Sequence, residues 1–297
     1  MTPVERDTIL VPTDFSDVAE FSMDHAAEIA KLFNHKICLL HVVSRNMSSI
    51  DNPLHGKLDR VAKDLAQKTG LQVRSMLREG SIFSTISEVA DEIRAEFIVM
   101  GIHGKKGVQH LVGSYAYKVI VSAHVPVLVV KDLHHHVGYH NIVVPIDFAQ
   151  DSTQKVKQAV RFARYFDAHV RVFGFLTTKS PARVIRKEAL LKEVRDTFDL
   201  YQVKVTTHLL IQPGAEWPAA LMKYAEEVDA DLVMIVAEKG DALMDVFSSN
   251  TAERIIDKID VPVLTVSREQ ADEGGEEEAR SVFKTFLDPM NVINQKK

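Results

Sequence analysis

Short apolar runs alternate with amphipathic stretches along the first part of the chain. The apolar runs fall near residues 8–13, 36–43, 71–77, 97–100 and 127–131. Between them, apolar residues recur at helical spacing, as do Ala19, Ala26, Ile29, Ala30 and Phe33. Apolar strands that alternate with helices are typical of a parallel sheet with helices on both faces. We therefore predict an α/β fold with a doubly wound, Rossmann-like, five-stranded parallel sheet in the order 3-2-1-4-5.

The same pattern occurs twice in the chain. The sequence Ile-Leu-Val-Pro-Thr-Asp-Phe at 9–15 recurs as Ile-Val-Val-Pro-Ile-Asp-Phe at 142–148. Val-Pro-Val-Leu at 125–128 recurs at 261–264. Shorter apolar elements recur between these landmarks in the same order. The repeat indicates two tandem copies of one α/β unit.

The repeat also sets the expected domain boundaries. We expect a first domain over residues 1–132, a second over 140–268 and an acidic C-terminal tail over 269–297. The first part of the tail is acidic and contains glycine, as solvated linkers do. Its later part carries enough apolar residues for a short segment that docks on this chain or on a partner.

The composition narrows the class of protein. The chain has 297 residues and a net charge of −5, and its contents of 46% hydrophobic and 26% charged residues are those of a soluble globular protein. No basic stripe is present, which disfavours nucleic acid as a partner. The single cysteine, Cys38, excludes a disulfide within the chain. No stretch approaches the about 20 apolar residues that span a bilayer, and residues 1–7 lack the apolar core of a signal peptide, so we expect a cytoplasmic protein without a membrane partner.

The residues after the fourth apolar run form the strongest candidate ligand site. Gly101 and Gly104 follow that run, and Gly113 and Ser114 open the next helical stretch. In a doubly wound sheet, ligands bind at the carboxyl ends of the strands where the strand order reverses. Glycines let backbone N–H groups approach a phosphate closely, and a helix N-terminus favours its negative charge. Asp14, which closes the first strand, is expected to face the same crevice and accept from ribose hydroxyls or an adenine amine.

These residues also have a simpler interpretation. Glycines after a strand often only form a turn, and Asp14, Ser16 or Asp17 can cap the helix that follows the first strand. Ser114 can likewise cap its own helix. The combination of loop glycines, Gly-Ser at a helix start and an Asp on the adjacent strand favours nucleotide binding over these alternatives.

On these residues the chain resembles a tandem universal stress protein. The family carries Gly-x2-Gly-x9-Gly-(Ser/Thr), with an Asp after a Val-Pro pair in the first strand. Val11-Pro12-Thr13-Asp14 and Leu40-His41-Val42 match its two strand motifs. The loop glycines and Ser114 match by type, with eight residues in place of nine before Gly113. The resemblance covers residues 6–131 and 140–267 and implies an adenine nucleotide alpha hydrolase-like fold.

The resemblance further implies a ligand and roles for residues. In the ATP-binding branch of the family, the Asp contacts the nucleoside, the second-strand valine holds adenine through its backbone, and the glycine loop with its Ser holds the phosphates. His103, inside the loop, is either a ribose or phosphate contact or an exposed loop residue. Lys105 and Lys106 either neutralise phosphate charge or lie in a solvated turn. The residues expected to bind ATP or AMP, with Mg²⁺ as a possible companion, are Pro12, Thr13, Asp14, Val42, Gly101, His103, Gly104, Gly113, Ser114 and Tyr115.

The second copy departs from this pattern. Its loop reads Ala237-Glu238-Lys239-Gly240, and eight residues then precede Ser249-Asn250. Two of the three glycines are replaced, and Glu238 adds a negative charge where a phosphate would lie. Asp147 is kept, but without the loop it is expected to cap a helix. We therefore expect the nucleotide in the first copy, with the second acting as a structural partner or holding a different ligand.

Histidines between the copies give a second, weaker candidate site. His134, His136 and His140 carry imidazoles of the kind that bind zinc or nickel. Adjacent residues of an extended segment cannot all face one ion, so a polar hinge is the simpler interpretation. His41 and His169, on or beside strands, are expected to be hydrogen-bonded core or crevice residues.

Three functions remain open at this point. The chain has no P-loop, pyrophosphatase loop, class I synthetase motif or nucleophile elbow, so we expect no dedicated catalysis. The main interpretation is a stress-response sensor or regulatory module that binds ATP or AMP. The alternatives are a protein-interaction scaffold with a vestigial site and a weak ATPase. The resemblance also implies that the last strands, 125–130 and 261–266, pair within the chain as a pseudo-dimer; a homodimer and unidentified protein partners stay open.

Overall fold

The computed structural model describes residues 6–44, 53–102, 112–131, 138–146, 156, 159–160, 162–164, 166–237 and 249–267. The first half contains, in chain order, β1 (Thr8–Pro12), α1 (Asp17–Phe33), β2 (Lys36–Val43), α2 (Pro53–Thr69), β3 (Val73–Glu79), α3 (Ile82–Glu92), β4 (Phe97–Gly101), α4 (Val112–Ser122) and β5 (Val127–Val130). The second half contains β6 (Asn141–Ile146), β7 (His169–Leu176), α6 (Pro181–Leu200), β8 (Val205–Ile211), α7 (Trp217–Glu227), β9 (Leu232–Ala237), α8 (Ser249–Lys258) and β10 (Val263–Ser267). The described residues between 156 and 164 are helical.

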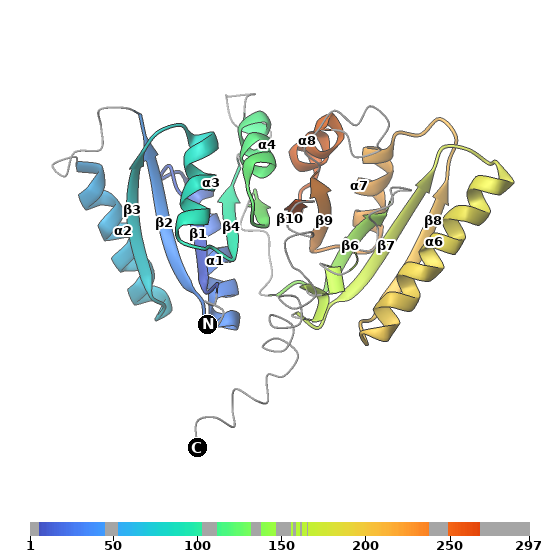
Figure 1. Ribbon diagram of the computed structural model, residues 1–297, viewed down its shortest axis with the longest axis horizontal. Helices are drawn as coiled ribbons and strands as arrows, with labels where there is room; N and C mark the ends of the chain where they lie inside the picture. The colour runs from blue at the N-terminus through green and yellow to red at the C-terminus, as the bar shows by residue number, and fades with distance from the viewer. Residues whose placement is uncertain are drawn as a thin grey trace, which may run out of the picture.

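The strands of both halves form one sheet in the order β3-β2-β1-β4-β5-β10-β9-β6-β7-β8 (Figure 1). Within each half, neighbouring strands are parallel. Each half therefore has the predicted order 3-2-1-4-5, and the predicted fold class is confirmed. The order reverses where β1 stands between β2 and β4.

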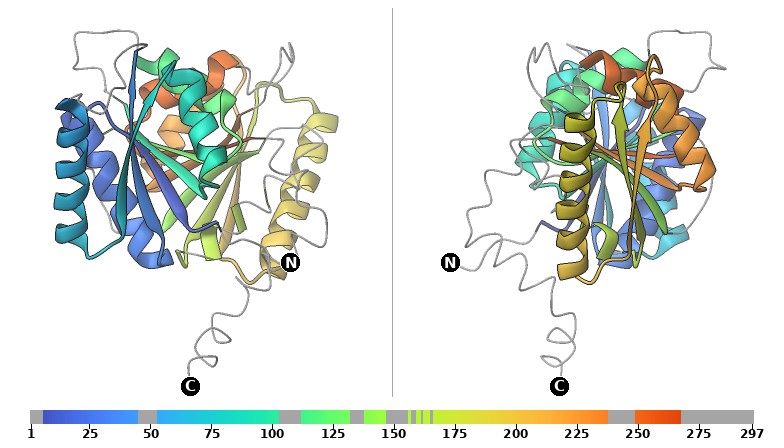
Figure 2. Two further views of the ribbon diagram at one scale, coloured as in Figure 1. Left: turned by 60° about the vertical axis from the view of Figure 1, so that its left-hand side comes forward. Right: turned by 90° about the vertical axis from the view of Figure 1, so that its right-hand side faces the viewer.

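Helices cover both faces of the sheet, as the two views of Figure 2 show. Side chains alternate between the faces along a strand, so Ile9 and Val11 join one core and Leu10 joins the other. The first core contains buried residues of α1, α2 and α6, and the second contains those of α3, α4, α7 and α8. None of the described helices combines the length and the apolar character needed to cross a membrane.

The two halves meet at β5 and β10, which pair antiparallel at the centre of the sheet (Figure 1). The hydroxyl of Thr265 on β10 donates to the carbonyl oxygen of Val127 on β5 over 3.1 Å. The ammonium of Lys131, which follows β5, donates to the carbonyl oxygens of Asp257 (2.7 Å) and Ile259 (2.6 Å) at the end of α8. The last strands of the two copies thus pair within the chain.

Aromatic rings add a second set of contacts between the halves. Phe97 of β4 meets Phe162 edge to face at 5.5 Å between ring centroids, and Phe33 meets Phe166 at 5.9 Å. Tyr139 packs on Phe166 at 5.0 Å, in the segment that leads into β6. Because these rings come from both halves, the same core continues across the junction.

Candidate functional site

The carboxyl ends of β1 and β4 form the edge at which the sequence predicts a ligand. β1 pairs with β4 through Ile9–Phe97 and Leu10–Ile98, and with β2 on its other side. Asp14 follows β1, and Gly101 is the last residue of β4. The switch point of a doubly wound sheet therefore lies between these two predicted residues.

Asp14 is exposed and forms part of a turn before α1. Its Oδ1 accepts from the backbone N–H of Ser16 over 3.0 Å and from the Ser16 hydroxyl over 2.5 Å. Ser16 is the N-cap of α1, since its hydroxyl oxygen accepts from the N–H of Ala19. Of the three residues proposed as caps of this helix, Ser16 is therefore the one whose side chain bonds a backbone N–H of α1. Asp14 orients that cap, and the same contacts fix its carboxylate at the edge of the sheet.

Thr13 is buried and joins the end of β1 to β2. Its N–H donates to the carbonyl oxygen of Leu40 over 2.8 Å, and its hydroxyl oxygen accepts from the N–H of Phe15 over 3.1 Å. Its carbonyl oxygen accepts from Nδ1 of His41 over 2.7 Å. The expectation that His41 is a hydrogen-bonded crevice residue is confirmed. His169 is also hydrogen-bonded, with its Nε2 2.8 Å from the hydroxyl of Thr206, but it begins β7 at the amino end of the strand, away from the crevice.

The backbone of Val42 faces the crevice. The carbonyl of Leu40 points towards β1, where it accepts from Thr13, whereas the carbonyl of Val43 accepts from Gly80 beyond β3. Backbone groups of successive residues point to opposite sides of a strand, so those of Val42 point to the same side as those of Leu40. β1 ends at Pro12, which pairs with Leu40. The N–H and C=O of Val42 therefore point past the end of β1.

Gly101 is needed for packing, whatever it binds. A Cβ added to it would lie 2.4 Å from the carbonyl oxygen of Val18 and 2.7 Å from its Cγ1. Both distances are well below van der Waals contact, so only glycine fits where β4 meets the first turn of α1. This contact also brings the start of the glycine loop next to the turn that carries Asp14.

The helix predicted after the loop begins at Val112, so Gly113, Ser114 and Tyr115 lie in the first turn of α4. His103, Gly104, Lys105 and Lys106 lie outside the described residues, as do Asp147 and residues 238–248 of the second half.

The proposed metal ligands are only partly described. His134 and His136 lie outside the described residues. His140 is exposed, and its backbone N–H donates to Oδ2 of Asp231 over 2.6 Å. Among the described residues, no group of three His, Cys, Asp or Glu side chains is arranged to hold a metal ion.

Sequence analysis did not single out two residues beside the crevice. Phe15 has a positive φ of 64°, which is uncommon for a bulky residue, and its ring lies 4.6 Å from that of His41. The ammonium of Lys57 on α2 lies 4.1 Å from the centroid of the Phe15 ring. This three-layer stack joins α2 to the end of β1. No sequence motif predicts this stack, because it depends on the left-handed backbone conformation of Phe15.

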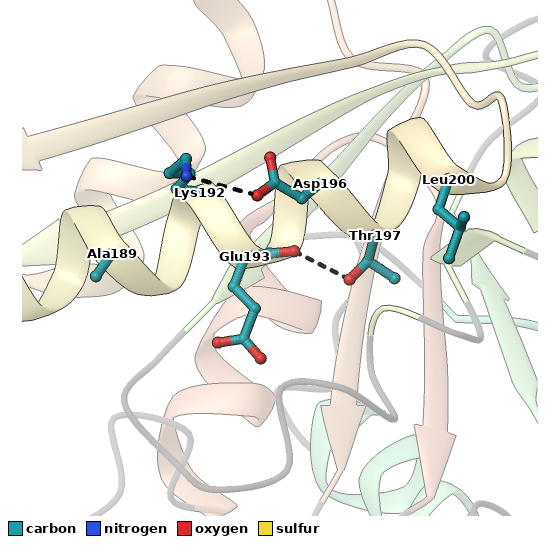
Figure 3. Close-up of a pocket in the computed structure, with 6 residues that line it drawn as sticks. All are labelled: Ala189, Lys192, Glu193, Asp196, Thr197 and Leu200. Atoms are coloured by element: carbon teal, nitrogen blue, oxygen red, sulfur yellow. Dashed lines mark hydrogen bonds and ion pairs between the residues drawn. The ribbon is translucent and has the colours of Figure 1, made fainter.

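A shallow hollow on the surface of α6 is remote from this edge (Figure 3). Its lining residues all lie on α6, from the middle of the helix to its last residue: Ala189, Lys192, Glu193, Asp196, Thr197 and Leu200. The helix runs back towards the amino end of β8, so the hollow lies away from the carboxyl ends of the strands. Two of the contacts there lie within the helix: Lys192 pairs with Asp196 at 3.9 Å, and the Thr197 hydroxyl donates to the backbone carbonyl of Glu193 at 2.9 Å.

Comparison with known proteins finds one family. The profile of the universal stress protein family matches residues 5–131 and again residues 138–267. Universal stress protein MJ0531 of Methanocaldococcus jannaschii is 34% identical over 138 residues, which cover 41% of this chain and 81% of that protein.

A solved structure shares this fold over most of the chain. A universal stress protein from Archaeoglobus fulgidus covers 89% of this chain and 97% of its own, with a TM-score of 0.68 and 18% identity. A second structure from Archaeoglobus fulgidus, solved in complex with dAMP, covers 43% of this chain and 98% of its own, with 25% identity and a TM-score of 0.37.

Proposed function

The chain belongs to the universal stress protein family, and on that premise we propose that it is a stress-response regulatory module that binds an adenine nucleotide, ATP or AMP, in its first half. The observation that carries the proposal is the direction of the Val42 backbone. Its N–H and C=O point past the end of β1, at the edge of the sheet where the exposed Asp14 follows that strand. A donor and an acceptor on one residue match the edge of an adenine ring.

The neighbouring residues suit the rest of a nucleotide. Asp14, held by Ser16, is placed to accept from ribose hydroxyls. The N-terminus of α4 carries Gly113 and Ser114, and a helix N-terminus favours phosphate. We assign the phosphates to Gly101, Gly104, Gly113 and Ser114, the ribose or a phosphate to His103, and the walls of the site to Pro12, Thr13 and Tyr115. Mg²⁺, if it accompanies ATP, would lie against the phosphates.

The test is a calorimetric titration of the full chain with ATP and magnesium. We expect one site per chain in the wild type. Gly113→Val places a branched side chain in the first turn of α4 and should lower the affinity at least tenfold. Ser249→Val is the matched control, because Ser249 is the counterpart of Gly113 in the repeated sequence and lies in the first turn of α8.

Two outcomes would contradict the proposal. Absence of ATP and AMP binding to the wild type would favour the scaffold alternative. Loss of affinity in Ser249→Val but not in Gly113→Val would show that the site is not in the first half. Phosphate release during the same titration, lost in Gly113→Val, would add slow hydrolysis to the function.

A further inference from the structure

A buried lysine stands at the carboxyl end of β6 in the second half. Lys187 belongs to α6, and only 1% of its surface is exposed. Its ammonium donates to the carbonyl oxygen of Ile146, the last residue of β6, over 2.7 Å. Lysine is among the residues least often buried, so this position is unusual for a surface helix of an α/β unit.

The first half uses the same carbonyl differently. Ile9 and Ile142 begin the repeated segments, so Thr13 and Ile146 are counterparts. The carbonyl of Thr13 accepts from the imidazole of His41 on β2. In the second half Ile146 pairs with Gly174 of β7, which places Gly174 at the position of His41. A histidine from a strand in one half is thus replaced by a lysine from a helix in the other.

Gly174 makes room for this replacement. A Cβ at residue 174 would lie 3.3 Å from Cε of Lys187 and 3.1 Å from Cδ1 of Leu191. Both distances are tighter than ordinary van der Waals contact, so the stem of Lys187 fills the space above Gly174. His41 is only partly buried in the first half, whereas the lysine that takes its place is enclosed.

We propose that the side chain of Lys187 fills the crevice of the second half and prevents nucleosides from binding there. Nucleotide binding is then confined to the first half. The inference rests on the proposed function. Unlike the half-buried His41, the stem of Lys187 is enclosed and fills the space above Gly174. A nucleoside that occupied this space would have to displace the stem and separate the ammonium from the Ile146 carbonyl. A charged donor inside the protein is costly to separate from its acceptor, so the closed arrangement is preferred.

Adenosine is the probe for the test, because it does not need the phosphate loop that the second half has lost. We expect the wild-type full chain to bind one adenosine. Lys187→Ala empties the space and should raise the stoichiometry from one to two. Lys187→Met keeps an unbranched stem of similar length and should leave the stoichiometry at one. Lys192→Ala, an exposed position of the same helix, is the matched control and should also bind one.

A second measurement needs no variant and tests whether adenosine displaces Lys187, even if Lys187→Ala does not fold. Lysines of the wild type are methylated reductively with and without saturating adenosine, and the peptides are read by mass spectrometry. Lys187 should stay unmodified in both conditions while Lys192 reacts. Adenosine that makes Lys187 reactive would show that the nucleoside enters the second crevice.

Failure of this inference is distinct from failure of the proposed function. Two adenosines bound to the wild type, or one bound to a folded Lys187→Ala chain, would overturn the role of Lys187 and leave nucleotide binding intact. A wild type that binds no adenosine, ATP or AMP would overturn the proposed function itself.

Discussion

Nδ1 of His41 donates a hydrogen bond of 2.7 Å to the carbonyl oxygen of Thr13. A carbonyl only accepts, so this contact fixes a proton on Nδ1. It ties the end of β2, which carries Val42, to the turn that carries Asp14. The ring of Phe15 packs against the same imidazole. The relative placement of the strand that should meet adenine and the carboxylate that should meet ribose therefore depends on His41.

Replacing His41 with leucine should loosen this junction. The buried carbonyl of Thr13 loses its donor, which we expect to lower the free energy of unfolding by about 1–3 kcal/mol and to weaken ATP binding. Urea denaturation and calorimetry measure the two effects. His124→Leu, at an exposed histidine beside Asp91, is the control and should change stability by less than about 0.5 kcal/mol. A His41→Leu protein with wild-type stability and affinity would argue against an organising role.

Gly101→Ala should be harmful for a reason unrelated to the ligand. The new methyl group would lie 2.4 Å from the carbonyl oxygen of Val18, so β4 and α1 must move apart. We expect unfolding to become easier by about 1–3 kcal/mol, measured by thermal or urea denaturation without nucleotide.

Gly56→Ala is the matched control for this substitution. Gly56 lies in α2, and nothing comes within 4 Å of a Cβ built there. Alanine in a helix interior should stabilise the protein by about 0.5–1 kcal/mol relative to glycine. If both substitutions had the same effect, the contact between Gly101 and Val18 would not explain the glycine.

Tyr139→Phe should leave the protein as stable as the wild type or stabilise it near neutral pH. Within the described part of the chain, the hydroxyl of Tyr139 is buried without a hydrogen-bond partner, while its ring packs on Phe166. Removing such a hydroxyl removes a desolvation cost of about 1 kcal/mol or more. Tyr139→Leu, which also removes the ring contact, should be destabilising, and the two variants are compared by urea denaturation.

The same residue predicts a pH dependence above neutrality. Burial, and then the negative charge of Asp231, raise the pKa of Tyr139 far above its value in the unfolded chain. The folded chain therefore keeps a proton that the unfolded chain loses from about pH 10 upwards. Stability should fall as the pH rises above that value, and less steeply in Tyr139→Phe. Parallel curves for the two proteins between pH 9 and pH 11 would contradict this assignment.

Lys131→Met should weaken the contact between the halves. Its ammonium caps the end of α8 through the carbonyls of Asp257 and Ile259, where a positive charge also meets the negative end of the helix. We expect a loss of about 1 kcal/mol in the free energy of unfolding. Lys192→Met, which only breaks an exposed pair with Asp196, should cost less than about 0.5 kcal/mol. Indistinguishable stabilities of the two variants would show that the cap does not hold α8.

Much of the fold follows from the sequence. The apolar run near residues 36–43 is β2, and the residues at helical spacing from Ala19 to Phe33 lie in α1. Such periodicities are readable because backbone geometry fixes which side chains share a face of a strand or a helix. The repeat and the crossover rule then give the order 3-2-1-4-5 in each half. The Gly-Ser pair was likewise placed correctly at a helix start.

Other features depend on which parts of the chain meet in space. The sequence identifies Gly101 as a loop glycine, but only its approach to Val18 explains why no side chain fits there. It shows that Gly174 replaces His41, but not that Lys187, on another element, fills the space. Periodicity reports the face on which a residue lies and nothing about its neighbour across that face. Which residue lies across a face depends on how the helices pack on the sheet and where the strands end. The contacts of Gly101 with Val18 and of Gly174 with Lys187 were therefore decided by the tertiary structure alone.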